Sequence, residues 1–286
     1  MYGSGKKTAG FYLGGAAVAI TAEKRSSGWV LTGLGKAHGV HTRAGAGLAD
    51  CAKRAVIAAG IKKGGIAVSI PDYLAHVVIL ELDDLSAKES EADEMIRLKA
   101  GRFLNLSLLD FKLSHHTLSR DKTVKVLAVA VKRDIIGEIE DALGSLGLYA
   151  ERINIHSLNL LNLLLAGKES NMDISVITFI DDHFTVMICS GAHLDYYRCK
   201  ESPASGAARE LSASFLSYRA HIGKRSCSPL EKVRLFGATD GFKELVKSAL
   251  DTELEEVQAS AFLSLDAFSL DVESQVAVLA ALGAGI

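Results

Sequence analysis

Short apolar strands alternate with amphipathic helices along this chain, and they do so in two successive halves. The first half opens with two strands joined by a polar turn, at 11–20 and 29–34. The second half opens near Asp173 with a meander of three strands. Mixed sheets covered by helices follow from such an alternation. The repetition predicts a two-lobed α/β protein with a cleft between its lobes.

The remaining elements are predicted from apolar periodicity and from turn residues. Ser86 and Glu89 have the form of a capping box before a helix, and Gly283 is expected to end the last helix. The helix at 157–165 is apolar nearly all round, so it should be buried. Further strands are predicted at 66–70, 75–82, 110–118, 124–131, 150–155 and 233–236, and further helices at 48–56, 92–103, 135–146, 208–222, 242–249 and 274–282.

Length and charge limit the class of protein. With 286 residues the chain can bury a large core, which suits one large domain or two lobes. The formal net charge of −2 gives no overall attraction to nucleic acid or anionic lipid. The longest apolar run, 158–166, is far shorter than the ~18 residues of a membrane span. We expect a cytoplasmic protein with buried thiols at Cys51, Cys189, Cys199 and Cys227.

Several segments have the order and spacing of one known family. They are Ile70–Leu82, Glu91–Leu104, Asp110–Leu118, Val126–Ala130, Ile153–Ser157 and Ala277–Gly285. In this order the chain resembles the actin-like ATPase fold, which is ribonuclease H-like, and more specifically the PilM family of type IV pilus assembly proteins. The resemblance implies a first lobe at 1–170, with an α/β insert at about 68–122, and a second lobe at 171–286.

The first nucleotide loop of that family reads Gly-apolar-Asp-apolar-Gly-Ser-Ser, with a lysine a few positions later. Gly10 and Gly14 fit this register, and Gly15 stands at the first serine. Tyr12 occupies the aspartate position and Ala19 the lysine position. A carboxylate would order magnesium and its waters, whereas a phenol and a methyl group cannot neutralise phosphate charge.

The other two loops are altered as well. The second loop, Asp-apolar-Gly in the family, becomes Phe179-Ile180-Asp181, and Asp182 adds a second negative charge. The adenosine loop, usually Gly-Gly, becomes Gly237-Ala238. The resemblance therefore implies degenerate nucleotide loops at Gly14, Gly15, Asp181, Gly237 and Ala238, without catalysis, cofactor or metal. The open alternative is an ATPase with a rewired site, in which Asp181 or Asp182 holds magnesium beside ATP.

Two sequence patterns that contain histidine or aspartate could suggest a metal site, but local structure also accounts for them. Asp181-Asp182-His183 lies between two predicted strands, where aspartate is favoured in tight turns, although a remodelled metal site is the alternative. His115 and His116 are neighbours on a predicted strand, so their side chains point to opposite faces of the sheet. The pair therefore cannot chelate one ion.

The family resemblance also implies a function and partners. PilM-type proteins are cytoplasmic scaffolds that bind a short cytoplasmic peptide of the membrane protein PilN, between the first-lobe core and its insert. They self-associate and communicate with the pilus motor ATPase. For this chain we expect the same role at the inner membrane through such partners, in a pilus or type II secretion-like machine, without nucleic acid. A soluble L-type secretion component is the second alternative.

Overall fold

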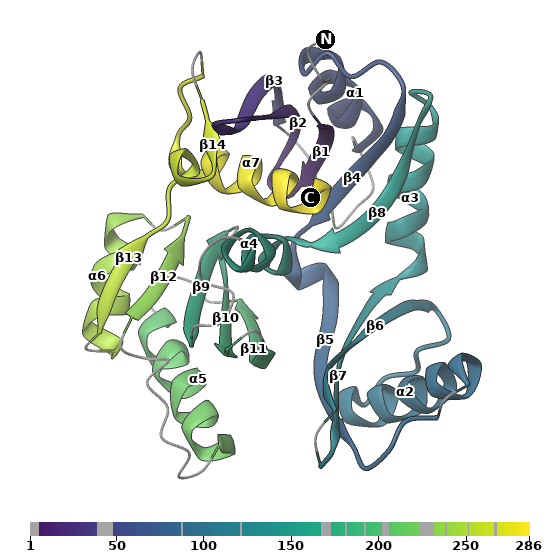
Figure 1. The fold of residues 1–286 in the computed structure, drawn as a ribbon, viewed down its shortest axis with the longest axis vertical. Coiled ribbons are helices and arrows are strands. Elements are labelled where there is room, and N and C mark those ends of the chain that lie inside the picture. The colour runs from purple at the N-terminus through teal and green to yellow at the C-terminus, as the bar shows by residue number, and fades with distance from the viewer. Residues whose placement is uncertain are drawn as a thin grey trace.

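In the computed structural model, the described part of the chain is organised by three β-sheets (Figure 1). Their strand orders are β14-β3-β2-β1-β4-β8, β11-β10-β9-β12-β13 and β5-β7-β6. The structure describes residues 6–38, 48–86, 88–120, 122–166, 173–180, 182–191, 193–201, 206–222, 232–237, 239–250, 252–265 and 268–286.

The six-stranded sheet is the core of the first lobe, and helices cover both of its faces. Its strands are β1 (Lys7–Leu13), β2 (Ala16–Arg25), β3 (Gly28–His38), β4 (Gly64–Ile70), β8 (Leu148–Ile155) and β14 (Leu263–Ser264). Side chains alternate between the faces along a strand, so Phe11 and Leu13 pack on one side and Tyr12 on the other. The first side holds α1 (Leu48–Ala58) and α3 (Arg133–Gly144), and the second holds α4 (His156–Leu165) and α7 (Val272–Gly285).

The insert forms a small sheet of its own, which carries one helix. After the short η1 (Asp72–Leu74) it contains β5 (Ala75–Leu82), α2 (Glu89–Leu104), β6 (Phe111–Arg120) and β7 (Val124–Lys132). The predicted end of the insert at about 122 is wrong, because the next strand also belongs to the insert. The reason is that β7 is the central strand of the small sheet and pairs antiparallel with both β5 and β6.

The second lobe is built on the five-stranded sheet, but it does not extend to the C-terminal residues. Its elements are β9 (Ile174–Ile180), β10 (His183–Ser190), β11 (His193–Glu201), α5 (Ala207–Ile222), β12 (Lys232–Phe236), α6 (Asp240–Leu250) and β13 (Glu253–Glu256). After η2 (Ala259–Ala261), β14 pairs with β3 and α7 packs against β1, β2 and β4. The predicted second lobe at 171–286 is therefore wrong for the final segment, because α7 is apolar all round and packs mainly against the first-lobe sheet and α4.

Two predictions about helix ends are wrong, one for the start of α2 and one for the end of α7. Ser86 is not the N-cap of α2, since the N-cap is Lys88 without a side-chain cap, and the Ser86 hydroxyl donates to Glu91 instead. Gly283 does not end α7, which continues to Gly285. A Cβ at Gly283 would overlap the carbonyl oxygen of Asn159 on α4. The glycine thus allows two buried helices to approach closely.

We predict that Gly283→Ala lowers the free energy of unfolding by about 2 kcal/mol, because the new methyl group must displace the α4 backbone. The matched control is Gly137→Ala in α3, where an added Cβ meets nothing within 4 Å. That substitution should leave stability unchanged or raise it by up to about 1 kcal/mol, because alanine has the higher helix propensity. Urea denaturation of both variants measures the difference, and equal stabilities would contradict the close-packing role.

Candidate functional site

A groove separates the small sheet of the insert from the first-lobe core. Its volume is about 190 Å³. Its walls are mostly aliphatic, with a polar strip contributed by β6. The lining residues are Ile70, Ser114, His115, His116, Leu127, Val129, Val131, Ile153, Asn154, Ile155 and Leu158. The groove lies where the family resemblance implies a peptide site.

The apolar wall follows from the sequence of β7. Val126, Ala128 and Ala130 are buried against the insert's own core around α2. The alternate residues, including Leu127 and Val129, face the first-lobe side and pack against the larger core clusters. A strand that is apolar on both faces is normally covered on both faces. The unbroken apolar run of β7 was thus the sequence signal for a second contact surface, and the prediction did not use it.

Two strand edges meet at this groove. β8 is the last strand of the six-stranded sheet and β6 is the last strand of the three-stranded sheet. Residues 153–155 of β8 and 114–116 of β6 line the groove from opposite sides. Edge strands offer unpaired backbone N–H and C=O groups, which an extended segment can pair with. The groove therefore combines apolar walls with backbone hydrogen-bonding capacity.

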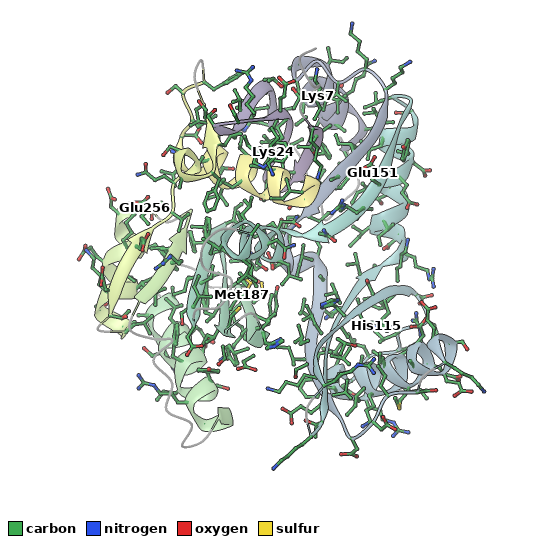
Figure 2. The ribbon with its side chains drawn as sticks, viewed as in Figure 1. Lys7, Lys24, His115, Glu151, Met187 and Glu256 are labelled. Atoms are coloured by element: carbon green, nitrogen blue, oxygen red, sulfur yellow. The ribbon has the colours of Figure 1, made fainter. Side chains whose placement is uncertain are left out.

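The two neighbouring histidines of β6 have separate surroundings. His115 points to the face of the small sheet that α2 covers, where its Nε2 lies 2.5 Å from Asp93 Oδ1 (Figure 2). His116 is exposed, and as the next residue along the strand it points to the opposite face. The described part of the chain contains no group of three or more histidine, cysteine, aspartate or glutamate residues arranged for a metal.

The first predicted nucleotide loop is a tight hairpin between β1 and β2. Gly14 and Gly15 form its turn, and the Gly14 amide donates to the Ala16 carbonyl at 3.1 Å. The Tyr12 side chain is 1% exposed, and its phenol lies so near Gly14 that a Cβ there would overlap it. The phenol ring also meets the His156 ring edge-on, with centroids 6.3 Å apart. Tyr12 is thus part of the packed interior.

In the second and third predicted nucleotide loops, the backbone conformation explains why Asp182 and Gly237 occupy their positions. Asp182 has φ 58°, in the left-handed region, and Ile180 of β9 pairs with His183 of β10. Aspartate tolerates this conformation, as the turn interpretation expects. Gly237 has φ 75°, and a Cβ there would overlap the Phe179 carbonyl oxygen. Asp181 and Ala238 lie outside the described residues.

A buried carboxylate joins the first lobe to the second. Asp72 of η1 is 2% exposed and accepts hydrogen bonds from the Ser157 amide, the Ser157 hydroxyl and the Tyr197 hydroxyl of β11, the last at 2.5 Å. His156 Nδ1 lies 2.6 Å from its Oδ2. These four residues are called the Asp72 cluster. Close by, the Tyr73 ring packs on the ring of His183, with centroids 4.3 Å apart.

Ionisation equilibria in the Asp72 cluster follow from burial and charge. Burial by itself raises the pKa of Asp72, but the His156 charge and the hydrogen bonds from His156, Ser157 and Tyr197 outweigh it, so the pKa lies below its ordinary value. Burial and the adjacent Asp72 charge raise the pKa of Tyr197 well above its usual range. The same two causes raise the pKa of the Cys199 thiol to about 12. The Asp72 cluster therefore holds Asp72 as a carboxylate anion, which accepts hydrogen bonds from Ser157 and Tyr197 and lies beside His156.

We predict that Asp72→Asn lowers the free energy of unfolding at pH 7 by about 3 kcal/mol, because it removes the charged acceptor from a buried set of donors. The low folded-state pKa of Asp72 stabilises the fold above about pH 4. That contribution is lost as the pH falls through the folded-state value. Chemical denaturation between pH 2 and pH 7 should show a smaller acid loss in the variant than in the parent. Glu140→Gln, at an exposed position on α3, is the control, and an Asp72→Asn profile equal to it would contradict this role.

Comparison with known proteins shows which solved structures have a similar fold. No protein-family profile and no curated protein matches the sequence. Among solved structures, the chain is similar to that of the PilM–PilN type IV pilus biogenesis complex, at 15% identity and a TM-score of 0.76, with 97% of this chain and 98% of that chain covered. Within the described residues, no helix is both long and apolar enough to cross a membrane.

Two further structures are similar over the whole length. One is a Bacteroides thetaiotaomicron protein of unknown function with an actin-like ATPase fold, at 10% identity, a TM-score of 0.57 and 96% of each chain covered. The other is the cytoplasmic domain of EpsL, an inner membrane component of the Vibrio cholerae type II secretion system, at 13% identity, a TM-score of 0.51 and 97% and 95% of the two chains covered. The chain therefore has an actin-like ATPase fold, and over nearly its whole length its architecture is that of PilM.

Proposed function

We propose that this protein is a scaffold that captures a short cytoplasmic peptide of a PilN-like membrane protein in the groove between the insert and the first-lobe core. In this role it works at the inner membrane through its partner, within a type IV pilus or type II secretion-like machine. It acts without hydrolysing ATP and without nucleic acid. Self-association and a link to a motor ATPase belong to the same proposal, by resemblance to PilM-type proteins.

The groove is the observation that carries the proposal. It combines aliphatic walls from Val129 and Ile153 with two strand edges, those of β6 and β8. Peptides bound by strand addition use backbone hydrogen bonds for affinity and side-chain pockets for specificity. Both requirements are met at one place. The PilM structure that resembles this chain is that of a complex with PilN, which supports a partner of the same kind.

The nucleotide loops support a role without catalysis. Tyr12 and Ala19, at the positions of the family's aspartate and lysine, are both buried in the first-lobe core. Neither side chain can hold magnesium or stabilise charge on a transferred phosphoryl group. The close approach of the Phe179 backbone explains why position 237 is a glycine, without any role for nucleotide. The described parts of these loops therefore have structural roles that require no nucleotide.

We predict that Val129→Asp weakens binding of a PilN-like N-terminal peptide at least about tenfold, because it places a charge in the apolar wall. The parent should bind a peptide of roughly 8 to 12 residues with an affinity on the order of micromolar, since ordering the peptide opposes binding. Calorimetric titration measures the affinity, and hydrogen exchange maps the protected amides, which we expect on β6 and β8.

Tyr149→Asp is the matched control. Tyr149 lies on β8, is 60% exposed and does not line the groove, so this variant should bind as the parent does. His116→Ala is a second groove variant at an exposed position, which tests the site without disturbing the core. Protection at the turn between β9 and β10 in place of β6 and β8 would refute the proposed site.

We predict no magnesium-dependent ATP hydrolysis. Each missing charged contact in a phosphoryl-transfer site costs about 3 kcal/mol of transition-state stabilisation, and at least two positions have lost their charge here. Phosphate release measured with and without magnesium should be equal. Release that requires magnesium and disappears in Asp181→Ala or Asp182→Ala would instead identify a rewired ATPase.

A further inference from the structure

A second hollow, on the α7 side of the first lobe, collects positive charge. Its volume is about 570 Å³. It lies where α4 and α7 end, beside the first residues of β1. We call it the basic hollow, and its lining residues are Lys6, Lys24, Trp29, Arg152, Asn162, Leu163, Ala166, Ala261, Phe262, Gly283 and Ile286.

Three cations from three places in the chain converge on the basic hollow. Lys6 precedes β1, Lys24 lies on β2 and Arg152 lies on β8. The Lys24 amide donates to the Lys6 carbonyl at 2.8 Å, which holds Lys6 beside Lys24 at the start of β1. Figure 2 shows Lys24 in front of α7, whose last residues also line the hollow.

Nearby acidic side chains do not neutralise these cations. Glu23 is the closest acid along β2, and it lies 4.0 Å from Lys7 and 3.7 Å from Arg25. Glu151 precedes Arg152, but its carboxylate packs against Gly65 on the neighbouring strand. No acidic side chain lines the hollow, and Lys6, Lys24 and Arg152 form no ion pair within the part of the chain that the structure describes.

Helix ends offset only part of this charge. The C-termini of α4 and α7 face the hollow, and each carries a partial charge of about −0.5. One α7 carbonyl, that of Gly285, is already taken by the Thr8 hydroxyl. Three full positive charges therefore exceed the helix contribution, and a carboxylate on Ile286 would still leave the hollow cationic.

The walls of the hollow favour an anion with a further organic part. Trp29 and Phe262 present half-buried aromatic surface, and Asn162 adds an amide that can donate or accept. Arginine and lysine together are typical ligands of phosphate, whose several oxygens can engage more than one cation at once. A single carboxylate would bring one negative charge to three cations, whereas a phosphate ester can bring two.

From this arrangement we infer that the basic hollow is a binding site for a phosphate ester, with Lys6, Lys24 and Arg152 holding the phosphate and Trp29 packing on the organic part. The phosphate belongs either to the headgroup of an anionic phospholipid or to a soluble phosphate ester. The site is separate from the peptide groove and does not depend on it. A lipid source would add a direct contact with the membrane surface beside the one through a partner.

The test uses Trp29, which is the only tryptophan in the chain, so its emission reports on the hollow directly. The full chain is titrated with inorganic pyrophosphate and, separately, with vesicles of phosphatidylcholine alone or with phosphatidylglycerol, followed by flotation. The test variant is Lys24→Gln with Arg152→Gln. The control is Lys53→Gln with Lys200→Gln, which has the same net charge and alters two exposed residues outside the hollow.

We expect a saturable change in Trp29 emission, at least about tenfold weaker in the test variant and unchanged in the control. A response to pyrophosphate identifies a soluble phosphate source. A response confined to vesicles with phosphatidylglycerol, with co-flotation, identifies a lipid headgroup. The inference is overturned if neither probe responds, if both double variants lose binding alike, or if poly-glutamate matches pyrophosphate. Melting temperatures equal to the parent's confirm that both variants are folded.

Discussion

The arrangement of the lobes depends on one buried carboxylate. Asp72 stands in η1, at the junction between the last core strand before the insert and the insert's first strand. A carboxylate removed from water costs several kcal/mol unless its lone pairs are engaged. Here the donors come from the start of α4 and from Tyr197 on β11 in the second lobe. The first-lobe core, the base of the insert and the second lobe must therefore meet at this point for the charge to be satisfied.

The groove is a consequence of that junction. The small sheet of the insert buries one face on α2 and directs its other face toward the first-lobe core. Two residues that line the groove are close in sequence to the Asp72 cluster. Ile70 lies two residues before Asp72, and Ile155 directly precedes His156. The Asp72 cluster thus sets the distance between the insert and β8. A further ion pair, Lys125 on β7 with Asp195 on β11 at 2.9 Å, joins the insert to the second lobe.

The residues at the predicted nucleotide loops have local structural roles. The turn between β1 and β2 contains Gly14 and Gly15, and the turn between β9 and β10 contains Asp182 in the left-handed region. These features are needed for the hairpins themselves. Tyr12 and Ala19, which stand at the aspartate and lysine positions of the family that the chain resembles, are both buried in the first-lobe core. The proposed role without catalysis requires no change in this backbone, because different atoms carry the fold and the chemistry of a site.

The sequence alone determined the local elements and part of the fold. Apolar periodicity predicted nearly every strand and helix, the buried character of α4, and the opposite faces of His115 and His116, because these depend on neighbours close in the chain. The tertiary structure alone decided that β7 belongs to the insert, that α7 returns to the first lobe, and that Gly283 serves helix packing. It also brought Asp72 to Tyr197, and Lys6 and Lys24 to Arg152. Strand pairing and charge clustering join residues far apart in sequence, and local patterns carry no information on which distant partner satisfies a given edge, face or charge.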